Sequence, residues 1–386
     1  MYILSMPLGI PFLLLLFVAI PANASTSFEQ IAKQADAARS AEHLNDAIHL
    51  YRQGLRLRPS WTDGWWSLGS VLYDQDRFPE AEDAFRHLVA LTPKRGPADA
   101  FLGLCEYETR EYDRALAHFR AWATAGWPGT PQLIDVAVFH FALLLTRDGE
   151  FIQALYLLAT EASKLGENPS LTEGMGLASL RMRNLPEDYS PEKREMVWLA
   201  GEAAVYAAQS GHELARADEY AARLESHYPQ QPEVHYFRGT LFTFEGRASD
   251  AEREYRAELE ISTQHVPAMI ALAGIDLDNS NLTEATSLAT QAVTLAPQDP
   301  EAHHALGRVL MASGQLPACA RELEIAKKLA PHSALVRSHL AMVYSRMGHT
   351  HAARTEAAAF LALKDKEGVL APPEAKLRSN GKEKAH

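Results

Sequence analysis

The chain contains only two cysteines, Cys105 and Cys319, which lie far apart in its 386 residues. A secreted fold that is held together by disulfides needs more of them, so this class of protein is excluded. Both cysteines fall inside helical patterns, where we expect them to be small, buried hydrophobic residues.

Basic residues are in deficit, because 37 Lys and Arg stand against 49 Asp and Glu and give a formal net charge of -12. An acidic surface repels phosphate backbones, so nucleic acid is excluded as a partner. The sequence is 47% hydrophobic and 22% charged, which allows a buried core and excludes a disordered polymer.

Motifs that carry chemistry are also lacking. No glycine-rich phosphate loop precedes a lysine, and no Gly-x-Ser-x-Gly motif is present. The tight pairs His303-His304 and His349-x-His351 have no nearby cysteine that would complete a closed metal site. We therefore expect no catalytic residue, no metal and no cofactor, and we interpret these histidines as exposed residues on helix faces.

Charged residues are absent from residues 1–24, which contain an apolar run over 10–20. Pro21 ends this run, and Ala22-Asn23-Ala24 has the small-x-small pattern of a signal-peptidase site. Although the start lacks Lys and Arg, we predict a signal peptide over 1–24, cleaved after Ala24, and an exported protein that is periplasmic or secreted. The alternative is an uncleaved membrane anchor over 3–20, which two prolines interrupt.

The main positive feature is a period of 34 residues. Small residues recur at Ala47, Ala81 and Ala115, and again at Ala217, Ala251, Ala285, Cys319 and Ala353. A ring follows four places later at Tyr51, Phe85, Phe119 and Tyr255, and a second small position gives Gly69, Gly103, Gly239, Ala273, Gly307 and Ala341. Prolines close the units at Pro59, Pro93, Pro229, Pro297 and Pro331. The apolar spacing predicts paired helices whose backbones approach closely at the small residues.

This pattern resembles the tetratricopeptide repeat, a helix–turn–helix unit of 34 residues, and its clearest copy runs over 62–95. The resemblance extends from Phe28 to about Lys364. It implies an all-α fold, a right-handed α-solenoid of stacked repeats, in which each hairpin buries its apolar face against the next one.

The period drifts between Ala115 and Ala217, where a helix over 171–183 has no obvious partner and a polar, turn-rich segment follows. We predict an N-terminal solenoid over 25–184, a loop insertion over 185–193, a C-terminal solenoid over 194–364 and a disordered tail over 365–386. The loop is interpreted as a surface insertion in a degenerate repeat, and the alternative is a hinge or docking loop between two solenoid halves.

The resemblance also implies a binding surface, because ligand contacts in this family come from the first helix of each unit, on the inner wall. The residues predicted to line a ligand-binding groove are Trp66, Ser70, Tyr73, Leu104, Tyr107, Tyr236, His304 and Arg308. Rings that the packing motif does not need are candidate anchors for a ligand. The alternative is that these rings fill the space between neighbouring helices.

A non-catalytic scaffold or adaptor follows from this resemblance, one that holds an extended peptide or protein segment in its groove, similar to periplasmic tetratricopeptide proteins of bacteria. The alternative is an accessory subunit of an envelope polysaccharide synthesis or export complex, in which the rings stack on sugars. The expected partner is thus a protein or peptide, with polysaccharide as the alternative. Membrane contact is expected only through an uncleaved N-terminal segment.

Overall fold

The computed structural model describes residues 27–166, 168–209 and 213–370, with the side chains of 365–370 left aside. These residues form nineteen α-helices and one short 3-10 helix, and no strand occurs among them. The predicted all-α solenoid is confirmed. None of the described helices is long and apolar enough to span a membrane. The predicted signal peptide over 1–24 lies outside the described residues.

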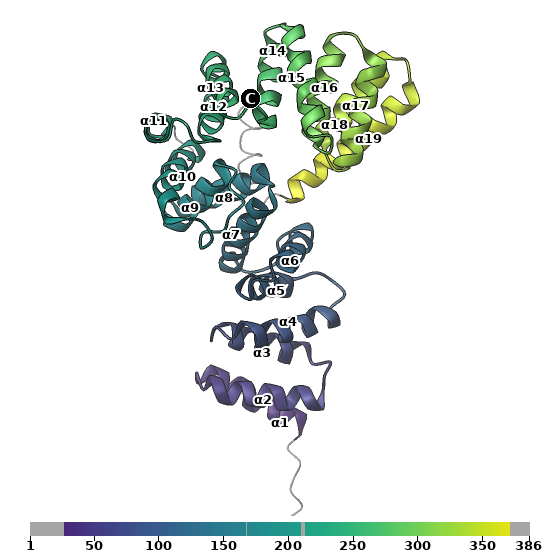
Figure 1. The fold of residues 1–386 in the computed structure, drawn as a ribbon. Coiled ribbons are helices and arrows are strands. Elements are labelled where there is room, and N and C mark those ends of the chain that lie inside the picture. The colour runs from purple at the N-terminus through teal and green to yellow at the C-terminus, as the bar shows by residue number, and fades with distance from the viewer. Residues whose placement is uncertain (1–26, 167, 210–212, 371–386) are drawn as a thin grey trace, which may run out of the picture.

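Consecutive helices pack against one another along the chain. Figure 1 shows a straight stack from α1 to α6, followed by a curved part that runs to α19. The helices are α1 (Phe28–Ser40), α2 (Leu44–Leu57), α3 (Thr62–Tyr73), α4 (Phe78–Leu91), α5 (Pro97–Glu108), α6 (Tyr112–Thr124), α7 (Pro131–Asp148), α8 (Phe151–Leu165), α9 (Pro169–Ser179), α10 (Arg194–Ala208), α11 (Leu214–His227), α12 (Val234–Phe244), α13 (Ala248–Ile261), α14 (Val266–Asp278), α15 (Leu282–Leu295), α16 (Pro300–Ala312), α17 (Leu316–Leu329), α18 (Ala334–Arg346) and α19 (Thr350–Leu370), with the 3-10 helix η1 (Pro191–Lys193) between α9 and α10.

Close approach within each hairpin follows the predicted register. The rings of Phe85, Phe119 and Tyr255 pack on the glycine that precedes each of them by sixteen places. A Cβ atom on Gly69, Gly103 or Gly239 would lie 2.9, 2.8 or 2.7 Å from the nearest ring atom. Real Cβ atoms do not approach ring carbons so closely, so only glycine leaves room for the ring.

The turn inside a hairpin places one residue in the left-handed conformation. This residue is glycine at Gly246, Gly314 and Gly348, where φ is +76°, +73° and +76°. The same turn position is filled by non-glycine residues elsewhere, namely Glu42, Asp76, Arg110 and Ser280. The left-handed region costs an L-residue about 1 kcal/mol, which glycine avoids.

A hydrogen bond also links many units to the unit before them. The residue six places after the proline that closes the preceding unit donates a hydrogen bond from its side chain to the carbonyl oxygen of that proline. The donor and acceptor pairs are Trp65 Nε1 with Pro59 (2.8 Å), His235 Nε2 with Pro229 (3.1 Å), His303 Nε2 with Pro297 (3.1 Å) and an Arg337 guanidinium nitrogen with Pro331 (3.3 Å). The closing proline therefore both stops a helix and supplies an acceptor for the next unit.

Three helices, α9 to α11, interrupt the regular pairing. The prediction of an unpartnered helix over 171–183 is wrong, because α9 packs tightly against α10. A Cβ atom on Gly176 would lie 2.0 Å from the Val197 carbonyl oxygen, and one on Gly201 would lie 1.9 Å from that of Thr172. Since α10 packs against α11 as well, it is shared between two neighbours.

The segment predicted as a loop insertion, 185–193, connects α9 to α10 and is not a free surface loop. Leu185 is fully buried in the core. The Tyr189 hydroxyl donates to the Glu173 carboxylate on α9, and the Tyr112 hydroxyl lies 3.4 Å from Glu187. At the other end of the chain, α19 continues to Leu370, past the predicted start of the tail at residue 365, and residues 371–386 lie outside the described residues.

Gly201→Ala should lower the free energy of unfolding by about 2 kcal/mol or more, because its methyl group would collide with backbone of α9 rather than with a side chain that can turn away. The matched control is Gly274→Ala on α14, where the nearest foreign atom lies 4.0 Å from the added Cβ. That variant should be neutral or up to about 1 kcal/mol more stable, because alanine is the better helix former. Urea denaturation followed by circular dichroism compares the two, and equal changes would contradict the tight α9–α10 contact.

Candidate functional site

Most of the predicted groove rings pack between neighbouring first helices. The Trp66 ring lies 5.6 Å from the Phe101 ring in an edge-to-face arrangement, and Tyr73 lies 5.3 Å from the same ring. Tyr107 lies 4.7 Å from the His140 ring. Burial raises the pKa of Tyr73 to about 12. These contacts favour the packing interpretation, and a ligand role for these half-buried rings stays a prediction.

Two of the predicted groove residues need correction. Leu104 and His304 are only 2% and 5% exposed, so neither offers a surface to a ligand. Leu104 belongs to the core, and His304 Nε2 lies 3.1 Å from His339 Nδ1 on the next first helix. The prediction that His303 and His304 are exposed is wrong for the same reason, because both side chains are used between units.

The remaining three predicted residues differ in their surroundings. Ser70 donates its hydroxyl to the Trp66 carbonyl at 2.9 Å, within its own helix. Arg308 is half-buried and lines a small cavity with His339 and Arg346. Tyr236 on α12 lies 4.9 Å from the His265 ring, and burial raises its pKa. Of the predicted residues, Tyr236 alone also lines the large apolar cavity described next.

An apolar cavity of about 370 Å³ lies between α8 and α12, and we call it the α8–α12 groove. Its walls carry large side chains that are far from buried, with Ile152 79% and Phe244 71% exposed. Small alanines of α9 and α10 form much of its lining in between. The lining residues are Phe151, Ile152, Leu155, Tyr156, Ala159, Met175, Ala178, Ser179, Arg181, Ala204, Ala207, Ala208, Tyr236, Phe237, Thr240, Leu241 and Phe244.

The three-helix segment α9 to α11 explains why these helices meet. In the predicted register α8 is the second helix of its unit and α12 is the first helix of another. A regular stack keeps first helices on one face and second helices on the other. The additional helix between them places α12 on the same face of the solenoid as α8. The family pattern predicts that first helices line one inner wall. Because of the additional helix, the first helices of the two halves do not form one continuous wall.

Arg181 provides the only charged side chain among the residues that line the groove. Its φ of +49° places it at the turn after α9. The guanidinium lies 4.6 Å from the centre of the Phe151 ring and 5.7 Å from that of Tyr236. Its ion pair with Glu233 is long, at 3.6 Å between Nε and the carboxylate oxygen. The groove thus has an apolar body and a cation at one end.

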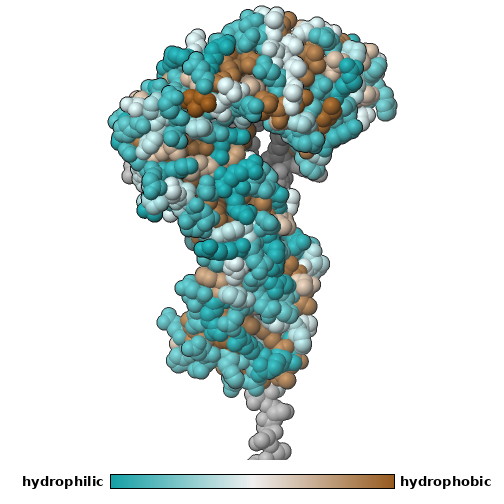
Figure 2. Space-filling view, viewed as in Figure 1, coloured by the Kyte–Doolittle hydropathy of each residue, from teal (hydrophilic) through white to brown (hydrophobic). Residues whose placement is uncertain are grey.

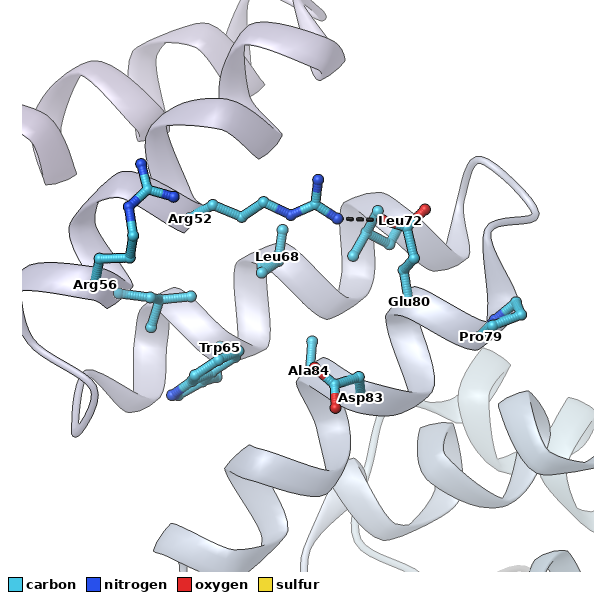
Figure 3. Close-up of a pocket in the computed structure, with 10 residues that line it drawn as sticks. Arg52, Arg56, Trp65, Leu68, Leu72, Pro79, Glu80, Asp83 and Ala84 are labelled. Atoms are coloured by element: carbon cyan, nitrogen blue, oxygen red, sulfur yellow. Dashed lines mark hydrogen bonds and ion pairs between the residues drawn. The ribbon is translucent and has the colours of Figure 1, made fainter.

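A second cavity, of about 450 Å³, lies between α2, α3 and α4 (Figure 3). Its apolar lining includes Leu68 and Leu72, which belong to the core. An ion pair between Arg52 and Glu80 joins α2 to α4 across it. A ligand there would have to break this pair, so the cavity is the weaker candidate for a binding site.

Carboxylates and a histidine that could hold a cation gather at one place among the described residues, at Glu225, His235 and Glu254. Each already has a charged partner. Arg238 lies 3.1 Å from Glu225, and Arg253 lies 3.2 Å from Glu254. His235 Nδ1 lies 2.8 Å from Glu254, while its Nε2 faces the Pro229 carbonyl. A metal ion would have to displace these cations, so the group is an ion-pair cluster of the repeat interface.

His235 faces an acceptor with each ring nitrogen, which only the doubly protonated imidazolium can satisfy. The hydrogen bond to Glu254 accordingly raises the pKa of His235. A raised folded pKa means that the stabilisation is fully present below the unfolded value of about 6.5 and is lost as the pH rises through the folded value.

His235→Gln should therefore cost roughly 1–2 kcal/mol of unfolding free energy at pH 6 and clearly less at pH 9. The matched control is His43→Gln at an exposed position, which should change little at either pH. Urea denaturation at the two pH values measures both variants. A cost that is the same at pH 6 and pH 9 would show that the histidine does not act as a cation.

Comparisons with known proteins agree with this arrangement of repeats. Residues 32–100 and residues 276–343 each match a family model of the tetratricopeptide repeat. No curated protein shows a significant sequence match. Similar solved structures include MamA 41-end from Desulfovibrio magneticus RS-1, with 22% identity, a TM-score of 0.34 and coverage of 40% of this chain and 85% of that chain.

Two further structures align over most of the chain. Yeast Tom70 has 11% identity and a TM-score of 0.34, with coverage of 93% of this chain and 95% of that chain. The APC/C hetero-tetramer Cut9-Hcn1 has 14% identity and a TM-score of 0.37, with coverage of 88% and 79%. The two family matches fall in the straight part and in the curved part, so similarity to the tetratricopeptide repeat is found in both.

Proposed function

We propose that this protein is an exported, non-catalytic scaffold that binds a segment of a partner protein in the α8–α12 groove. The tetratricopeptide repeat is a protein-interaction fold, and both family matches are to this repeat rather than to an enzyme. The observation that carries the proposal is the exposure of Ile152 and Phe244 on opposite walls of one apolar groove. Exposed apolar surface that is gathered in a concave site is typical of interaction sites.

The surface as a whole supports the same choice. Figure 2 shows hydrophobic patches within the otherwise hydrophilic surface of the curved part. Single exposed apolar residues are common and need no explanation, whereas several around one cavity do. The rings of Trp66 and Tyr107 are partly engaged by neighbouring rings, so the inner wall of the straight part is a secondary candidate.

Export is supported by the sequence of residues 1–24, with its apolar run and its Ala22-x-Ala24 ending. The proposed location is the periplasm or the extracellular medium, with an N-terminal membrane anchor as the alternative. A partner would then be another envelope or secreted protein. The role of an accessory subunit in a polysaccharide synthesis or export complex remains the alternative, with the half-buried rings stacking on sugars.

Ile152→Glu and Phe244→Glu should each abolish capture of a protein partner from an envelope extract, because a carboxylate placed in the groove must be desolvated on binding. Both positions are exposed, so circular dichroism should show an unchanged fold. Leu361→Glu on α19, where the side chain is 60% exposed, is the matched control and should bind normally. Capture that survives both groove variants would contradict the proposal, and binding to a glycan array without any protein capture would favour the polysaccharide alternative.

A further inference from the structure

We infer that the occupant of the α8–α12 groove is an amphipathic helix of the partner protein, with an acidic residue that pairs with Arg181. This inference rests on the proposed function and names the chemistry of its partner. It also replaces the predicted extended segment with a helical one at this groove. Four features of the groove favour this occupant, namely its length, the small residues on its floor, its few hydrogen-bond partners and the charge of Arg181.

The length of the groove is set by its two walls, α8 and α12. The lining residues of α8 extend from Phe151 to Ala159, and those of α12 extend from Tyr236 to Phe244. At a rise of 1.5 Å per residue, each wall is about 12 Å long, which corresponds to roughly two helical turns. An occupant therefore needs apolar residues at about i, i+3 or i+4, and i+7, which is one face of a short helix.

The floor of the groove is suited to close approach. Ala178, Ala204, Ala207 and Ala208 carry the smallest side chains that a helix can present without glycine. Helices pack at axial distances of roughly 8–10 Å, and the shorter distances need small residues at the contact. The larger side chains of Leu155 and Leu241 stand on the two sides. This shape fits a cylinder lying between α8 and α12.

Hydrogen bonding separates a helix from an extended chain. The groove offers few partners for a backbone, because the Thr240 hydroxyl already donates to the Tyr236 carbonyl at 2.9 Å and the other lining hydroxyls are those of Tyr156, Ser179 and Tyr236. An extended segment would leave its own N–H and C=O groups unpaired against apolar walls, at a substantial cost in free energy. A helix satisfies these groups internally, so only its side chains need to match the groove.

Charge is provided by Arg181 at one end of the groove. Its guanidinium carries five N–H donors, and the described residues offer it the long ion pair to Glu233 but no hydrogen bond. The Glu233 carboxylate is shared, since His265 Nε2 lies 3.1 Å from it. With rings beside it, the guanidinium is partly desolvated, so a carboxylate on the occupant would gain a charge-assisted hydrogen bond.

The test uses the full chain and synthetic, fluorescently labelled peptides of about 14 residues, whose binding is followed by anisotropy. One peptide has leucines at i, i+3, i+4 and i+7 and a single Glu at one end, prepared with the Glu at either end. The second peptide replaces that Glu with Gln, and the third has the same composition in alternating, strand-like order. The better of the two Glu peptides should bind, and the alternating peptide should not.

Replacing Glu with Gln in the peptide should weaken binding roughly tenfold for the natural chain and hardly at all for Arg181→Gln. Arg181→Lys, which keeps the charge, should retain part of the difference, and melting curves establish that both variants fold. Equal binding of the alternating peptide, or a tenfold effect that persists in Arg181→Gln, would overturn the inference. If no helical peptide binds while partner capture still depends on Phe244, the helix is wrong and the protein-binding groove stands.

Discussion

The structure depends on one backbone contact, the approach of α9 to α10 at Gly176 and Gly201. A Cβ atom added at Gly176 or Gly201 would lie 2.0 or 1.9 Å from a carbonyl oxygen of the other helix, far inside van der Waals contact. Elsewhere in the solenoid, a glycine makes room for the ring of a partner helix, as Gly69 does for Phe85. In α9 and α10 the backbones themselves meet, so this pair is held more closely than a standard repeat.

Because of that contact, α10 packs against both α9 and α11. This arrangement changes which helices lie on each face of the solenoid. A stack of hairpins repeats every two helices, so one additional helix exchanges the sides on which first and second helices lie. The groove between α8 and α12 exists because of this exchange. Side chains such as Ile152 and Phe244 would belong to opposite faces in a regular array, and here they line one cavity. A break in the repeat thus creates a surface that no single repeat contains.

Much of the fold could be predicted from the sequence, because the 34-residue period reports on local spacing. The contact of Gly103 with Phe119 follows directly from the pattern. The pairing of α9 could not be predicted, since its contact with α10 depends on glycines that are out of register with the period. The burial of His303 and His304 could not be predicted either, because nothing in the sequence marks the Pro297 carbonyl and the His339 ring as their partners. Of the residues that line the candidate groove, the sequence predicts Tyr236 alone, because the family pattern places ligand contacts on first helices and α8 is a second helix.

The most direct test of the account is site-specific photocrosslinking in intact cells, with a benzophenone side chain placed at Phe244 or at Leu361. Both side chains are well exposed, at 71% and 60%, so the two positions are equally open to chance collisions. The account predicts a discrete crosslinked protein product from position 244 and none from position 361. Equal products from both positions, or products from position 361 alone, would contradict the claim that the α8–α12 groove is where this solenoid binds its partner.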